Sequence, residues 1–134
     1  MKFKIFEKLK HLTISGEINY KSAEHNIQSA IDYLLEERSV TSLRLFSAIC
    51  NLHISKGYHH SFFQDSNNKS LQLSFERDPS DFFVVYLYAL SKFCCGEEAR
   101  ASQLFVRLEK SGWKNKVIAK EMNEKLLMGK ECCG

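Results

Sequence analysis

The sequence has little proline and glycine, with one and six residues among 134. Collagen-like and low-complexity chains need far more of both, and disordered chains have less than the 44% hydrophobic content found here. No run of about 18 uncharged apolar residues is present, so no segment is predicted to cross a bilayer. The longest apolar block, residues 82–90, is too short for that. We therefore expect one compact domain over residues 1–134.

Sequence motifs of catalysis are missing as well. The chain has no G-x-S-x-G, H-E-x-x-H, P-loop or G-x-G-x-x-G. Zinc ligands within one pair are usually separated by roughly two to five residues, whereas His59–His60 and the cysteine pairs 94–95 and 132–133 are adjacent. We predict that the protein is not an enzyme and has no catalytic residue, no metal site and no cofactor.

The predicted compartment is the cytoplasm. The lysine-rich start resembles the first part of a secretory leader, but Glu7, Lys8, Lys10 and His11 interrupt the apolar stretch of about 7–15 residues that a leader needs. The chain has five cysteines. An odd number fits reduced thiols better than a disulfide framework.

The net charge of +3 hides an uneven distribution. Residues 1–11 carry four lysines and one glutamate, and residues 110–130 carry six lysines and two glutamates. Residues 12–109 between them carry nine basic and twelve acidic groups. Because the basic ends contain lysine and no arginine, which is the better residue for bidentate phosphate contacts, they are interpreted as solvated helix faces. Nucleic acid is therefore an unlikely partner.

Apolar spacing predicts an all-α fold of about five or six helices in antiparallel hairpins. The segments 19–38 and 40–56 join at Ser39 with almost no loop, which predicts one such hairpin. Residues 82–90 are apolar all round, which predicts a central helix. Its predicted start has Asp78 as the cap and Pro79 in the first helical position. The expected helices span residues 3–12, 19–38, 40–56, 79–95, 97–110 and 114–128.

Residues 58–77 are the irregular part of the chain. Leu71, Leu73 and Phe75 alternate with polar residues, a pattern that is compatible with a small β-hairpin near 62–75. A partly ordered loop with a short helix fits the segment equally well.

The segment from Gly96 to Gly112, with the preceding Tyr86-x-x-Ala89-Leu90, resembles a tetratricopeptide or pentatricopeptide helical hairpin. The similar positions in its second helix are Gly96, Ala101, Leu104, Phe105, Leu108 and Gly112. The resemblance covers residues 83–112, and no second copy follows at the period of about 34 residues. It implies helix-hairpin packing.

Two groups of side chains are candidates for binding a partner. The first combines aromatic and polar residues of the irregular segment, which form an interface cluster if they are exposed. The second is an acidic helix face that suits a basic partner. The first group is Tyr58, His59, His60, Phe62, Phe63 and Asp65, and the second is Glu24, Asp32, Glu36 and Glu37.

These features favour a non-enzymatic protein-binding protein. By analogy with single helical domains of this size, we expect a small cytosolic immunity protein that neutralises a bacterial toxin by direct binding, with no role for a membrane. The alternative is an RNA-associated or regulatory helical-repeat adaptor that uses its lysine-rich terminal helices. A cysteine- or metal-dependent enzyme is the third hypothesis.

Overall fold

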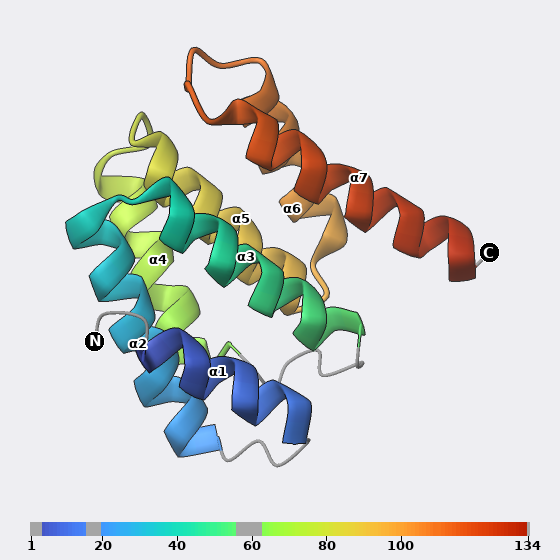
Figure 1. The fold of residues 1–134 in the computed structure, drawn as a ribbon. Helices are drawn as coiled ribbons and strands as arrows, with labels where there is room; N and C mark the ends of the chain where they lie inside the picture. Colours follow the sequence, from blue (N-terminus) through green and yellow to red (C-terminus); the bar gives the residue numbers. More distant parts are fainter. Residues whose placement is uncertain (1–3, 16–19, 56–62, 134) are drawn as a thin grey trace.

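The computed structural model describes residues 4–15, 20–55 and 63–133, with side chains described for 4–10, 24–55 and 63–128 (Figure 1). The fold is all-α, as predicted. The described residues form seven helices and no strand. The helices are α1 (Lys4–Ser15), α2 (Tyr20–Glu37), α3 (Val40–Ser55), α4 (Asp65–Arg77), α5 (Phe82–Cys94), α6 (Glu98–Glu109) and α7 (Lys116–Cys133).

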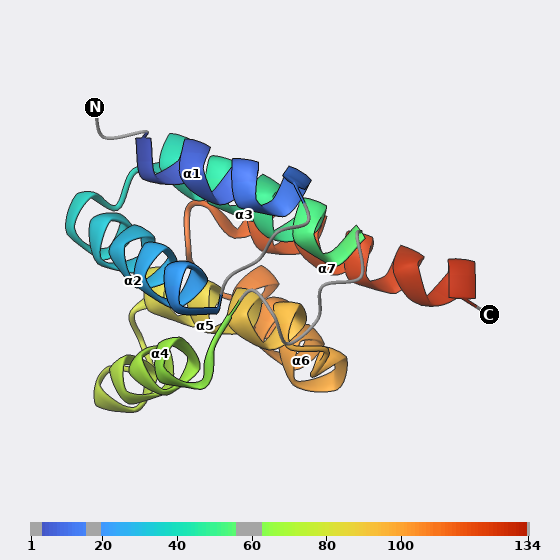
Figure 2. The same cartoon turned by 90° about the horizontal axis from the view of Figure 1, so that it is seen from below.

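The central helix is α5, because nearly all of its side chains are buried. It begins three residues later than Pro79 suggested, since Asp81 is the N-cap and its carboxylate accepts a hydrogen bond from the Val84 N–H. It ends at Cys94, and the chain turns away at Gly96, whose φ of 82° favours a residue without a Cβ. Figure 2 shows α3 and α7 on one side of α5 and α4 on the other.

The expected hairpin of α2 and α3 is not formed. The two helices diverge from a corner at Arg38, while α1 packs against both (Figure 1). Phe6 of α1 lies between them, with its ring 5.7 Å from the Tyr33 ring of α2 and 6.3 Å from the Phe46 ring of α3. Burying that ring keeps the two helices apart. Arg38 allows the change of direction, because its φ of 53° is left-handed.

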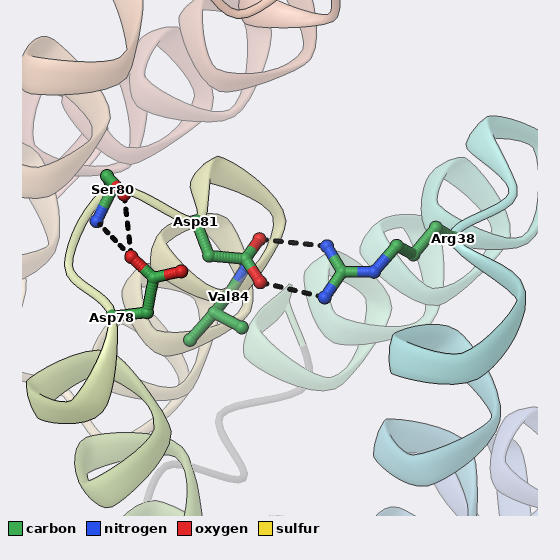
Figure 3. A network of polar contacts seen from close by, with 5 residues as sticks. All are labelled: Arg38, Asp78, Ser80, Asp81 and Val84. Atoms are coloured by element: carbon green, nitrogen blue, oxygen red, sulfur yellow. Dashed lines mark hydrogen bonds and ion pairs between the residues drawn. The ribbon is translucent and has the colours of Figure 1, made fainter.

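Arg38 also ties this corner to the start of α5. Its guanidinium donates two parallel hydrogen bonds of 2.8 and 2.7 Å to the Asp81 carboxylate (Figure 3). The guanidinium lies 5.6 Å from the centre of the Phe83 ring. These hydrogen bonds lower the pKa of Asp81 and raise that of Arg38, although burial opposes both shifts. The end of α2 is thereby fixed against the central helix.

The predicted β-hairpin near 62–75 is wrong over the described residues from 63 onward, because residues 65–77 form α4. Leu71 and Phe75, four residues apart, lie on one helix face, where Leu71 is fully buried and Phe75 stacks on Tyr88 at 5.1 Å. Leu73, which a strand would place beside them, is 53% exposed. The apolar pattern therefore follows the helical period.

The last three helices pack as two successive hairpins, α5 with α6 and α6 with α7. The helix α7 continues beyond Met128, where its end was predicted, to Cys133. Both views show its C-terminal half extending past the ends of the other helices (Figures 1 and 2). No helix in the described part of the chain is both long enough and apolar enough to cross a membrane.

Candidate functional site

The four predicted acidic residues of α2 are all exposed. The helix carries no lysine or arginine between positions 22 and 37. The first basic residue after it, Arg38, is paired with Asp81. Glu36 and Glu37 occupy the last turn, where the helix dipole disfavours negative charge and no basic side chain is present. This surface is therefore negative along most of the helix.

The beginning of α4 adds to the same surface. Asp65 is exposed in the first turn of α4, where the dipole favours an acid. The next residue, Ser66, donates a 2.8 Å hydrogen bond from its hydroxyl to Glu24 Oε1. Five carboxylates thus lie on α2 and at the start of α4, and we call them the acidic face. Its members are Glu24, Asp32, Glu36, Glu37 and Asp65.

A fully buried amide holds α4 against α2. The Asn67 Nδ2 donates to the Glu24 carbonyl oxygen at 3.2 Å and to Gln28 Oε1 at 3.0 Å. Gln28 in turn donates to Asp32 at 3.0 Å. Because a buried amide is costly without partners, these bonds fix the separation of the two helices. The carboxylates of the acidic face are therefore held on a rigid support.

Two open clefts adjoin Glu24 and Ser66. One has a volume of about 490 Å³ and is also lined by His25, Gln28 and Asn67. The other has a volume of about 350 Å³ and is also lined by Phe63, Gln64 and Asp65. The acidic face is thus recessed where α2 meets α4, and the recess offers oxygen acceptors to a donor from outside.

Of the residues predicted to form an aromatic cluster, the structure describes only Phe63 and Asp65. Tyr58, His59, His60 and Phe62 lie outside the described residues. The predicted anchor role of Phe63 depends on exposure, and Phe63 does not meet that condition, because it is only 2% exposed. Its ring packs edge-on against Phe46 at 6.1 Å, so it belongs to the core.

Three residues of this region were not predicted from the sequence: Gln28, Ser66 and Asn67. A signal for Asn67 was present. Once residues 65–77 are treated as a helix, Asn67 lies four residues before Leu71 and eight before Phe75, which places it on the buried face. A polar residue at such a position needs partners, and α2 supplies them.

The described cysteines and possible metal ligands are not arranged as a reactive thiol or a metal site. Cys50 and Cys94 are both fully buried, and burial raises the pKa of the Cys94 thiol. A buried thiol of this kind is a weak nucleophile. Within the described residues, no three histidine, cysteine, aspartate or glutamate side chains gather where they could hold a metal ion. Comparison with protein-family models, with curated proteins and with solved structures finds no match.

Proposed function

We propose that this chain is a non-enzymatic protein-binding protein that uses its acidic face to bind a basic surface of a protein partner. More specifically, we propose a cytoplasmic immunity protein that neutralises a bacterial toxin domain by direct contact. The observation that carries the proposal is the acidic face on α2 and α4, with its recess beside Glu24.

The physical basis is electrostatic complementarity on a rigid support. Opposite charges steer partners together and select the right one, while like charges exclude wrong partners. Because Asn67 fixes the spacing of α2 and α4, little ordering of the backbone is needed when a partner binds. The recess gives a lysine or arginine side chain of the partner room to reach Glu24.

The RNA-associated alternative rests on Lys114, Lys116 and Lys120, which are all exposed near the start of α7. Proteins that bind single strands usually also present aromatic rings for base stacking. Among the described residues, the large exposed hydrophobic side chains are aliphatic, and Trp113 is only 8% exposed. The acidic face is therefore the better candidate surface.

The test is affinity capture with three baits. The first is the wild-type chain, and the second is a face variant with Glu24→Gln, Asp32→Asn and Asp65→Asn. The third is a charge-matched control with Glu7→Gln, Glu76→Gln and Glu124→Gln, three exposed acids outside the acidic face. We expect one protein partner with wild type and control, and its loss with the face variant.

The neutralising role needs a second assay. The captured partner is expressed in sensitive cells with or without this chain. We expect the partner alone to stop growth and co-expression of wild type, but not of the face variant, to restore it. A partner that is harmless to the cells would contradict the immunity role and leave only the binding role.

A further inference from the structure

A small cavity lies between α3 and α7, with α5 as its floor. Its volume is about 80 Å³, which is more than a single water needs and too little for a nucleotide or a large ring. The cavity shares no lining residue with the two clefts beside Glu24, so it is separate from the α2–α4 recess. Its polar lining residues are Arg44, Ser47, Tyr86, Glu121 and Lys125, and its remaining walls are aliphatic or from methionine.

The floor is a pair of buried hydroxyls. Ser47 Oγ donates to the Leu43 carbonyl oxygen at 2.7 Å, so its single hydrogen is used there. The Tyr86 hydroxyl, 2.6 Å from Ser47 Oγ, must then be the donor of that second bond. With both hydrogens committed to protein groups, the floor has no hydroxyl hydrogen left for an incoming group.

The rim carries donors and an acceptor side by side. Arg44 Nη1 of α3 lies 3.3 Å from Glu121 Oε2 of α7, and both side chains are 50% exposed. Lys125 follows Glu121 by one helical turn. An incoming cation is repelled by Arg44 and Lys125. An incoming anion is attracted by these two residues, but it is repelled by Glu121 and competes with that carboxylate for Arg44. A neutral group that both donates and accepts has no such repulsion.

We propose that this cavity binds a primary carboxamide, the group at the end of asparagine and glutamine side chains. Its N–H groups donate to the Glu121 carboxylate, and its carbonyl oxygen accepts from Lys125 or Arg44. The aliphatic walls pack against the methylene groups that carry the amide. The site goes beyond the proposed function, because it uses none of the residues of the acidic face.

The experiment is a titration of the full chain followed by NMR, with propionamide, propionate and propylammonium as probes of nearly equal size. We expect saturable shifts of signals from α3 and α7 with propionamide and much weaker shifts with the two ions. Free glutamine and a glutamine blocked at both ends then distinguish a free metabolite from a segment of a protein as the source of the amide.

Two matched variants locate the site. Glu121→Ala removes the rim acceptor, whereas Glu124→Ala removes an equally charged, exposed residue of α7 that does not line the cavity. We expect propionamide binding to weaken about tenfold in the first variant, the usual effect of losing one hydrogen bond to a charged group, and to be unchanged in the second. Since both positions are exposed, the fold of each variant is checked by circular dichroism.

Three results would overturn the assignment. They are propionate or propylammonium binding as well as propionamide, equal weakening in both variants, and no saturable binding of any amide. The last result would mean that the cavity holds water only.

Discussion

At the scale of single residues, the Arg38–Asp81 pair has two structural tasks. It completes the N-cap of α5, and it holds the corner at which α2 turns into α3 (Figure 3). Arg38 adopts a left-handed backbone that costs a residue with a side chain on the order of 1 kcal/mol. The two charged hydrogen bonds to Asp81 offset that cost.

Replacing Asp81 by asparagine tests this pair. The amide oxygen can still accept from the Val84 N–H, but the ion pair is lost, so we expect the free energy of unfolding to fall by about 1 kcal/mol at neutral pH. Because the pKa of Asp81 is lowered in the folded state from its ordinary value of 3.8, the unfolded chain binds more protons near that pH. The wild-type advantage is therefore complete above about pH 5 and shrinks as the pH falls below 4.

Urea unfolding across this pH range measures the effect. The control is Asp32→Asn, which makes the same chemical change and breaks no ion pair among the described residues. A wild-type advantage that persists unchanged to the lowest pH would show that charge plays no part in the pair.

At the scale of helices, α4 is anchored by few apolar contacts. It is the most polar of the helices, and Leu71 is its fully buried aliphatic residue. Asn67 and Phe75 complete the face that meets α2 and α5.

Two leucines on this helix give a direct comparison. Leu71→Ala removes a fully buried side chain, and we expect a loss of about 2–4 kcal/mol in the free energy of unfolding. Leu73→Ala, at a position 53% exposed, should change it by less than about 0.5 kcal/mol. Chemical denaturation of both variants measures the two changes in the free energy of unfolding. Equal losses would fit the alternating burial of a strand and contradict the helix.

The last turn of α2 carries charge of the wrong sign for stability. We expect Glu36→Lys to raise the free energy of unfolding by about 0.5–1 kcal/mol, because a cation suits the C-terminal end of a helix. The same change should weaken binding of the partner. Thermal unfolding and affinity are measured beside Glu124→Lys, which reverses a charge in the middle of α7 and gains nothing from the dipole. A loss of stability in Glu36→Lys would show that the glutamate is needed for the fold.

The positions of α2 and α3 could be predicted from the sequence because burial follows the apolar period. The position of α5 could be predicted because its apolar run is continuous. The corner at Arg38 could not, since a left-handed arginine has no signal in the sequence where a glycine would have one. Residues 71–75 fit a period of two as well as a period of four, so that segment was ambiguous. Four carboxylates of the acidic face were predicted as one surface, whereas Asp65 was predicted as part of the aromatic cluster. The link between α2 and α4 was not, because Asn67 meets partners 39 and 43 positions away.

At the scale of the whole molecule, a small net charge conceals surfaces of different character. The acidic face lies on α2 and α4, exposed lysines lie near the start of α7, and a cavity with mixed charges lies between α3 and α7. A basic partner, an acidic partner and a neutral polar ligand would therefore bind to different surfaces of the protein. Of these surfaces, the acidic face is the one proposed to bind the partner.

The most direct test compares, in one experiment, what the wild type, the face variant and the charge-matched control capture from the source cells. Bound material is identified by mass spectrometry and assayed for RNA. We expect one protein partner that is retained by the wild type and the control and lost by the face variant. Equal capture of that partner by all three baits would contradict the proposal, and so would recovery of RNA in place of a protein.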